Sequence, residues 1–144
     1  GRLEKALQLG AWHVIDGREE DTVDRSRALF GGDGADIVFE TAGSRVTAMQ
    51  SFASVRRGGE VMIVGTIPGE TPVDFLKINR EVKVQTVFRY ANNFPMTIQA
   101  ISSGRFDVLT MVTDEYAYED VQKAFEESIS RKAEIIKGVI RISG

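Results

Sequence analysis

Short, continuous apolar runs separated by amphipathic stretches are the feature that most limits how this chain can fold. The runs Ile37–Phe39 and Val61–Val64 have no polar residue inside them, and Val82–Phe88 and Trp12–Ile15 are two further β-prone segments. A strand that is covered on both faces has this continuous pattern, which is typical of parallel sheets. The alternation therefore predicts an α/β fold with a parallel sheet and right-handed crossovers.

The stretches between the runs predict helices and turns. Leu3, Ala6 and Leu7 share one helix face, and Gly10 ends that helix. A polar helix is expected over 19–30, closed by a glycine-rich turn at 31–34. Further along we expect a helix carrying Val46, Met49 and Phe52 that ends at Gly58-Gly59, a loop over 66–72 and a short helix around Phe75, Leu76 and Ile78.

The last third of the chain changes character. Pro95 is expected in the first turn of a helix capped by Asn92 or Asn93, with Ile98 and Ile101 facing inward and Gly104 at its end. A short strand is expected over 111–113 and an alternating one over 139–142. Between them, 118–130 has apolar residues at the spacing of an amphipathic helix: Val121, Ala124, Phe125, Ser128 and Ile129. Glu119 and Asp120 suit the first turn of that helix.

Composition excludes several classes of function. The net charge of −3 does not suggest a nucleic-acid or anionic-membrane surface, and no apolar run could span a bilayer. The first residues are charged rather than apolar, so we expect no secretory signal and a cytoplasmic protein. With no cysteine and one histidine, His13, the chain cannot form a Cys₂His or Cys₄ zinc site. We expect His13 to be structural, because no other metal-ligand residue of that type lies near it.

Candidate binding residues follow three of the expected strands. Glu40–Gly43, Gly65–Thr66 and Phe88–Tyr90 come directly after apolar runs. In an open parallel sheet these turns lie on one edge, where ligands bind. Simpler interpretations exist for each: the glycines close turns, Glu40 is an exposed polar end, and Arg89 is a surface charge. Only the joint placement of these residues favours a ligand site, and the pattern does not identify the ligand.

The segment Val87–Asn92, followed by Pro95, resembles a segment of sorbitol (L-iditol 2-) dehydrogenase and related xylitol enzymes, which are zinc-dependent medium-chain dehydrogenases. Other pieces agree in order across the chain: Arg2-Leu3, Leu9–Ala11, Glu40–Gly43, Gly58-Gly59, Val64-Gly65, Arg80–Val82, Ser103-Gly104, Val112-Thr113 and Ala124–Glu126. The resemblance implies a Rossmann-type parallel sheet over 1–104, and a tail, 105–144, that joins the catalytic domain in the family.

Residue roles are carried over from the resemblance alone. They place Arg2 beside the adenosine ribose of NAD, Val64, Gly65 and Thr66 at the nicotinamide, and Val87, Phe88 and Arg89 at its carboxamide. Thr41 belongs to the same cofactor-binding set, and Arg89 and Tyr90 are implied polyol contacts. A guanidinium can donate several hydrogen bonds to vicinal hydroxyls, which suits that role.

The sequence departs from the family pattern in ways that matter. The Gly-x-Gly-x-x-Gly turn that holds the pyrophosphate, the acidic residue that binds the ribose and the zinc-binding catalytic domain are not in the sequence. The turn Gly31–Gly34 follows a helix and precedes a strand, so we interpret it as a plain loop. In the family sheet order 3-2-1-4-5-6, strands 1 and 2 would be missing. We expect Trp12–Ile15 to pair directly with Ile37–Phe39, or a second copy or upstream residues to fill the gap.

The resemblance implies an enzyme that transfers a hydride between a polyol or secondary alcohol and NAD, with zinc as a Lewis acid in the full-length enzyme. We expect no catalytic residue and no zinc in this chain, and no turnover by it alone. The family also implies a homo-oligomer formed through the strand at 82–87. Two alternatives are a non-catalytic nucleotide-binding or dimerisation module, and a threonine or simple alcohol dehydrogenase of the same superfamily.

Overall fold

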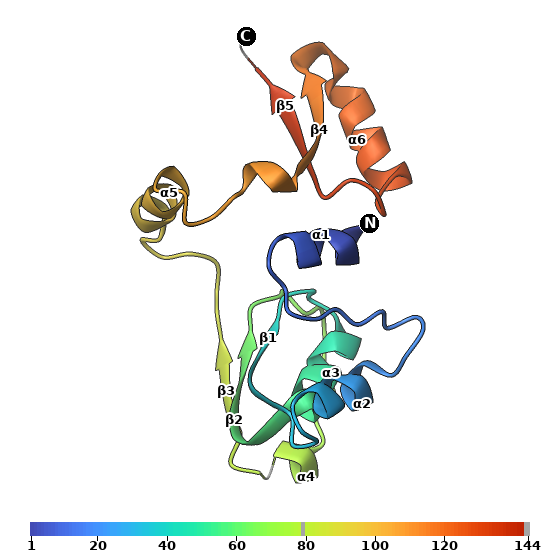
Figure 1. Cartoon of the computed structure of the whole chain (residues 1–144), viewed down its shortest axis with the longest axis vertical. Helices are drawn as coiled ribbons and strands as arrows, with labels where there is room; N and C mark the ends of the chain where they lie inside the picture. Colours follow the sequence, from blue (N-terminus) through green and yellow to red (C-terminus); the bar gives the residue numbers. More distant parts are fainter. Residues whose placement is uncertain (79, 143–144) are drawn as a thin grey trace. The chain divides into compact units, whose positions relative to one another are not determined.

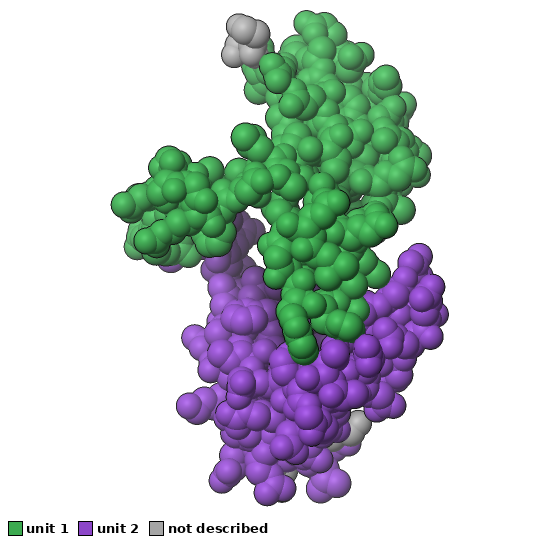
Figure 2. Space-filling model, viewed as in Figure 1, with its two compact units in different colours: residues 1–14, 92–144 green, residues 15–91 purple. Residues whose placement is uncertain are grey.

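The structure, a computed structural model, describes residues 1–78 and 80–142, with the Lys77 side chain left out. The chain forms two compact units, one of residues 15–91 and the other of 1–14 with 92–144 (Figures 1 and 2). Among the described residues, no helix has the length and apolarity needed to cross a bilayer.

A three-stranded parallel sheet forms the centre of the unit at 15–91. Its strands are β1 (Ala35–Glu40), β2 (Val55–Ile63) and β3 (Lys83–Thr86), in the order β1-β2-β3. Val38 pairs with Val61, which in turn pairs with Val84. Val61 has no exposed surface, so the sheet core is centred on the middle strand. The predicted parallel α/β arrangement is confirmed.

Two helices of this unit pack together, α2 (Thr22–Leu29) and α3 (Arg45–Ser54), and α3 also packs on β1 and β2 (Figure 1). Asp21 caps α2, because its carboxylate accepts hydrogen bonds from two backbone amides of the first turn. Small buried residues of α3, Ala48, Ser51 and Ser54, let it approach the sheet closely. The short helix α4 (Phe75–Ile78) follows the loop at 66–72, as predicted.

Two expectations for this unit are wrong. The helix carrying Met49 does not end at Gly58-Gly59: it ends at Ser54 and continues directly into β2, which contains both glycines. Nor is β1 covered on both faces, since Ile37 and Phe39 are 50% and 60% exposed. The main contacts of β1 are with β2 and α3, and they leave much of this apolar strand uncovered.

The expected strand at Trp12–Ile15 is not formed. The described residues of this segment have no strand pairing, and the Trp12 side chain is 75% exposed. An isolated strand is not stable without a neighbour that satisfies its backbone groups. The expected direct pairing with Ile37–Phe39 is therefore also wrong, because β1 pairs with β2 alone in the described sheets.

The second unit contains a parallel β4-α6-β5 crossover, formed by β4 (Val112–Ala117), α6 (Val121–Ser130) and β5 (Lys137–Arg141). Ala124 is the buried residue of α6. Its other elements are α1 (Arg2–Gln8), α5 (Phe94–Ser102) and the short 3₁₀ helices η1 (Leu109–Met111) and η2 (Tyr118–Asp120). Helices at α1, α5 and α6 and strands at β4 and β5 were predicted, whereas η1 was not, and Asn93 is the N-cap residue of α5.

The predicted buried faces of this unit are only partly correct. Ile98 and Ile101 of α5 are 63% and 38% exposed rather than inward-facing. Phe125 and Ile129 of α6 are also exposed, although their spacing is that of an amphipathic helix. A helical apolar face is buried only where another element covers it, and little covers these faces within the unit. Glu119 and Asp120, expected in the first turn of a helix over 118–130, lie in the 3₁₀ turn η2 that directly precedes α6.

Candidate functional site

The turns after β1, β2 and β3 meet at one edge of the sheet. Glu40, the last residue of β1, pairs with Ile63, which pairs with Thr86. Backbone bonds extend this alignment beyond the strands: Val64 and Gly65 donate to the Glu40 carbonyl oxygen, each at 2.9 Å, and Val87 donates to that of Ile63 at 2.8 Å. The parallel register therefore brings the predicted residues Thr41, Val64–Thr66 and Val87–Tyr90 to a common edge.

Glu40 lies beneath this edge. Its side chain is buried, with 3% of the residue surface exposed. The carboxylate Oε1 accepts hydrogen bonds from the Thr47 hydroxyl (2.6 Å) and from the amides of Gly43 (2.9 Å) and Ala42 (3.0 Å). The interpretation of Glu40 as an exposed polar end is therefore wrong. Its Oε2 is buried and has no hydrogen-bond partner among the described residues.

The ionisation of Glu40 follows from these contacts. Burial raises the pKa of the carboxyl group, because the charged form loses hydration. Hydrogen bonds from the Thr47 hydroxyl and from backbone amides of Gly43, Ala42 and Ser44 stabilise the charged form, and the resulting pKa lies below its ordinary value. Glu40 is thus a carboxylate near neutral pH, fixed between helix α3 and the turns.

Gly43 and Gly65 are glycines because the two turns pack against each other. Gly43 has a φ of +69°, and a Cβ there would lie 2.8 Å from the Thr66 carbonyl oxygen. A Cβ at Gly65 would overlap the Gly43 backbone and come within 2.5 Å of Glu40 Oε2. Packing within the protein accounts for both glycines, so the structure supports the interpretation that they close turns.

The third turn presents large exposed side chains. Phe88 and Tyr90 are 86% and 62% exposed, and Val87 is partly exposed. The guanidinium carbon of Arg89 lies 5.3 Å from the centroid of the Phe88 ring, a cation–π contact. Arg89 has a φ of +55°, in the left-handed region that a residue with a Cβ seldom adopts. This backbone conformation, next to an exposed aromatic ring, marks the turn as unusual.

Arg2 is not brought together with the other predicted residues. It belongs to the unit of residues 1–14 and 92–144, where its Nη2 donates to the carbonyl oxygens of Lys132 (2.7 Å) and Ile135 (3.0 Å). These bonds join α1 to the turn after α6 within that unit. The implied ribose contact of Arg2 stays a prediction.

The residues of this chain do not fit a catalytic zinc centre. The sequence has no cysteine and a single histidine, His13, whose ring centroid lies 6.0 Å from that of Trp12. Within 1–78 and 80–142 there is no group of three or more His, Asp or Glu side chains that could hold a metal ion. No chemical step of this chain is therefore assigned to zinc.

Comparison with known families agrees with the resemblance of the sequence to zinc-dependent dehydrogenases. The sequence model of the zinc-binding dehydrogenases matches residues 1–103. The chain belongs to this family. Its similarity to zinc-type alcohol and sorbitol dehydrogenases, first indicated by the Val87–Asn92 segment, is thereby confirmed.

Two curated dehydrogenase relatives match nearly the whole chain. The zinc-type alcohol dehydrogenase-like protein YdjJ of Escherichia coli (strain K12) is 63% identical over 142 residues, which are 99% of this chain and 41% of that protein. Sorbitol dehydrogenase of Bacillus subtilis (strain 168) is 37% identical over 143 residues, 96% of this chain and 40% of that enzyme. The chain thus spans about two fifths of the length of these relatives.

Solved dehydrogenase structures have the same fold. An E. coli oxidoreductase/dehydrogenase of unknown specificity, ECK1772, superposes with a TM-score of 0.93 at 62% identity, over 99% of this chain and 41% of that one. The 2R,3R-butanediol dehydrogenase of B. subtilis gives a TM-score of 0.85 at 25% identity, again over 99% and 41%. These matches confirm the Rossmann-type assignment.

Two residues that organise the edge had no specific role assigned from the sequence. Glu40 was the first residue of a candidate turn, Glu40–Gly43, with an exposed polar end as its simpler interpretation, and Thr47 was not considered. A signal for both was available: Ser44 and Thr47 have the spacing of a helix cap, and a glutamate that ends an apolar strand needs hydrogen-bond donors. Thr47 does donate its amide proton to Ser44 Oγ (3.2 Å) and its hydroxyl proton to Glu40.

Proposed function

We propose that this chain forms the nicotinamide-facing and substrate-facing part of an NAD-dependent polyol dehydrogenase. The observation that carries the proposal is the exposed turn at Val87–Tyr90, in which Arg89 has a left-handed backbone, on the same sheet edge as Val64–Thr66. In open parallel sheets the carboxyl ends of the strands are where ligands bind. Family membership makes a nicotinamide cofactor the expected ligand there.

The chemistry assigned to the chain is positioning. The cofactor supplies the hydride chemistry when it is bound. Exposed backbone groups of Val64–Thr66 and Val87–Arg89 would hold the carboxamide and fix the face of the ring. The donors of Arg89 would bind adjacent hydroxyls of a polyol, with Tyr90 beside them. Thr41 lies on the turn after β1 and would line the same edge.

The substrate class rests on the polyol segment and on the sorbitol dehydrogenase relative. The butanediol dehydrogenase match also favours a secondary alcohol with a neighbouring hydroxyl, which two donors of one guanidinium can bind together. A threonine or simple alcohol dehydrogenase remains the alternative within the family. We propose NAD rather than NADP, a cytoplasmic location, and a role for 105–144 in the catalytic domain of the whole enzyme.

Self-association through β3 is a second proposal. β3 is the last strand of the described sheet, and its outer edge has no partner strand among the residues described. Such an edge can pair with the same strand of a second copy. Val84→Pro would remove a backbone donor and disfavour pairing, so light scattering should show a dimer only for the unaltered chain. A monomer at all concentrations would contradict the proposal.

The cofactor proposal can be tested on the chain itself with two uncharged probes that have no phosphate. Reduced nicotinamide riboside, titrated into ¹⁵N-labelled chain, should shift the amide signals of Val64–Thr66 and Val87–Arg89. Adenosine is the matched control and should leave these amides unchanged. If nicotinamide riboside shifts only amides elsewhere, or none at millimolar concentrations, the assignment of this edge is wrong.

A further inference from the structure

The amino-terminal end of β2 contains an unusual insertion. Ala35 pairs with Val55, but Ile37 pairs with Glu60, so Arg56–Gly59 stand opposite the single residue Asp36. Gly58, with a φ of +68°, allows the sharp turn of this bulge, and its amide donates to the Arg80 carbonyl oxygen at 2.8 Å. A bulge re-aims the side chains of the strand that contains it. It thereby brings two consecutive arginines close to a third.

Four arginines and Asp33 line a hollow of about 500 Å³ at this place. Arg27 comes from α2, Arg56 and Arg57 from the bulge, and Arg80 from the turn before β3. We call this the arginine pocket. Counting Asp33 and Asp36, which pairs with Arg56, its net charge is +2, whereas the whole chain carries −3. The arginine pocket is therefore positively charged although the chain as a whole is negatively charged.

Most of these guanidinium groups lack an acidic partner. Arg56 is engaged: its Nε bonds to Asp36 at 2.5 Å and its Nη1 donates to the Arg57 carbonyl oxygen. Arg57 and Arg80 form no ion pair among the residues that the structure describes. The Nε of Arg27 is buried and has no hydrogen-bond acceptor within the described part of the chain. A buried donor without an acceptor is unfavourable, and an anion beside this guanidinium group would offset that cost.

We propose that the arginine pocket binds a small molecule with a diphosphate or several phosphate groups. One planar guanidinium group can bind two oxygens of a phosphate at once. Several such groups that point into one pocket favour an anion with more than one negative charge. The volume suits a small organic phosphate rather than a single ion. The pocket lies at the amino ends of the strands, a strand length of about 20 Å from the carboxyl-end edge. Its ligand is therefore distinct from the nicotinamide part of a cofactor at that edge.

Inorganic pyrophosphate is the probe for this site. Calorimetric titration of the chain at low ionic strength should show one binding event, with a dissociation constant below about 1 mM. Arg57→Gln combined with Arg80→Gln should weaken binding by about tenfold or more. Arg105→Gln, which removes an exposed arginine of the other unit, is the matched control and should leave the affinity unchanged. Amide shifts of Arg57 and Gly58 on titration should locate the binding event.

Asp33→Asn is a second test, in which the affinity for pyrophosphate should increase. A variant that fails to fold could lose binding but could not produce such an increase. Removing the acidic side chain from the pocket should tighten pyrophosphate binding by about threefold or more. The proposal is overturned if the unaltered chain does not bind pyrophosphate, or if Arg105→Gln weakens binding as much as the pocket double variant. A folded Asp33→Asn chain with unchanged or weaker affinity would also contradict it.

Discussion

At the scale of single residues, Glu40 and Thr47 connect the sheet to the turns above it. The Thr47 hydroxyl donates to Glu40 Oε1 from helix α3, and the Glu40 carbonyl oxygen accepts two amides from the turn after β2. One glutamate thus fixes two turns and a helix. Since its carboxylate is buried, each hydrogen bond that it accepts counts for more than one at the surface.

The Thr47 hydroxyl can be tested by a pair of substitutions. Thr47→Val keeps the shape but removes the donor, so we expect the free energy of unfolding to fall by about 1–3 kcal/mol at pH 7. Thr47→Ser keeps the hydroxyl and should lose much less. Urea titrations followed by circular dichroism measure both. Equal losses for Val and Ser would show that the hydroxyl contributes no more to stability than the methyl group, contrary to this account.

The hydrogen bond between Thr47 and Glu40 also predicts how the stability of the chain depends on pH. The pKa of Glu40 is lowered in the folded chain, so the stability that it contributes is fully present above its ordinary pKa of 4.5 and is lost as the pH falls through the folded value. Thr47→Val should raise that folded pKa, and its stability should change less between neutral pH and pH 3 than that of the unaltered chain. A steeper acid loss in Thr47→Val would contradict this account.

Sequence patterns found the strand-end positions but not the orientation of their side chains. Thr41, Gly65 and Arg89 could be placed on one edge because a parallel sheet aligns strand ends. The sequence could indicate that Glu40 needs hydrogen-bond donors, but not which donors it has, since that depends on the groups that the fold brings within reach. The positive φ of Arg89 was equally hidden, because arginine has no preference for that region.

At the scale of elements, the turns after β1 and β2 form one packed unit, and glycine is required where they touch. Gly65→Ala should destabilise the chain by about 1–3 kcal/mol or more, because the added methyl group overlaps the Gly43 backbone. Gly138→Ala is the matched control. Its Cβ would meet only ordinary contacts, 3.4 Å at the nearest, and should change stability by about 0.5 kcal/mol at most. Similar losses in urea titrations of both variants would exclude crowding as the cause.

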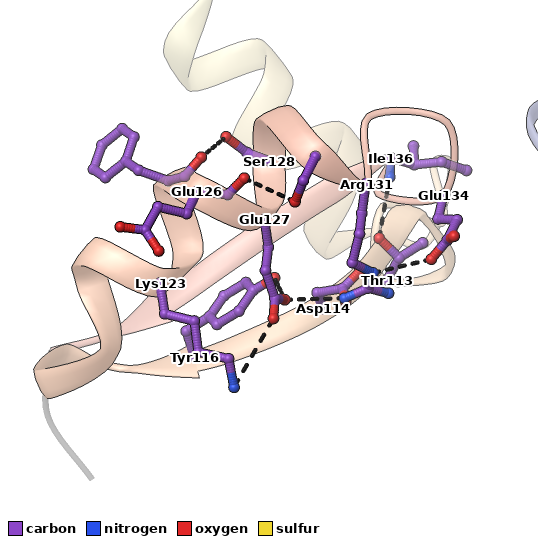
Figure 3. A network of polar contacts seen from close by, with 12 residues as sticks. Thr113, Asp114, Tyr116, Lys123, Glu126, Glu127, Ser128, Arg131, Glu134 and Ile136 are labelled. Carbon is purple, nitrogen blue, oxygen red and sulfur yellow. Dashed lines mark hydrogen bonds and ion pairs between the residues drawn. The ribbon is translucent and has the colours of Figure 1, made fainter.

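The β4-α6-β5 crossover contains a polar network that joins helix and strand (Figure 3). Arg131 bonds to Glu127 (3.0 Å), Asp114 (3.1 Å) and Glu134 (2.9 Å), and the Tyr116 hydroxyl donates to Glu127 at 2.9 Å. The hydrogen bond from Tyr116 is the largest cause that holds the pKa of Glu127 below its ordinary value, against partial burial, with Arg131 adding to it. Burial and the Glu127 carboxylate raise the pKa of Tyr116.

Tyr116→Phe should therefore raise the pKa of Glu127. Because that pKa is lowered in the folded chain, the stabilisation is present above its ordinary value of 4.5 and is lost as the pH falls through the folded pKa. The variant should have a lower melting temperature at pH 7 and a smaller further drop on acidification. NMR titration of the Glu127 carboxylate reads the pKa directly. Tyr118→Phe, an exposed tyrosine nearby, should change neither quantity.

Helices and strands were largely predictable, while their covered faces were not. The spacing of Val121, Ala124 and Phe125 correctly predicts α6, but Phe125 is 64% exposed. Periodicity records which side of a helix is apolar, and burial requires a second element to lie against it. The end of α3 was misplaced for a different reason: Gly58-Gly59 was interpreted as a helix stop, whereas it forms the bulge of β2.

At the scale of the whole molecule, the largest apolar feature is the exposed surface beside β1, an outer strand of the described sheet. A hollow of about 430 Å³ lies along this strand, lined from β1, α2 and α3 by residues that include Ile37, Phe39 and Phe30. All three side chains are at least half exposed. In the sheet order that the family resemblance implies, a further strand lies beside β1. The continuous apolar sequence of β1 is therefore explained by contacts that this chain does not make by itself.

This surface should bind an uncharged apolar dye. Exposed apolar patches of this kind bind such dyes, whereas scattered single residues do so weakly. Nile red fluorescence should rise on mixing with the chain, and the double substitution Ile37→Thr with Phe39→Thr should lower that rise by about half, since it removes much of the exposed apolar area. Leu109→Thr, which changes a still more exposed residue of the other unit, should have little effect. Because Nile red has no charge, the arginine pocket does not contribute. An unchanged rise in the double variant would mean that the surface beside β1 is already covered, for example by a second copy of the chain, and sedimentation of that variant would then show the same assembly as the unaltered protein.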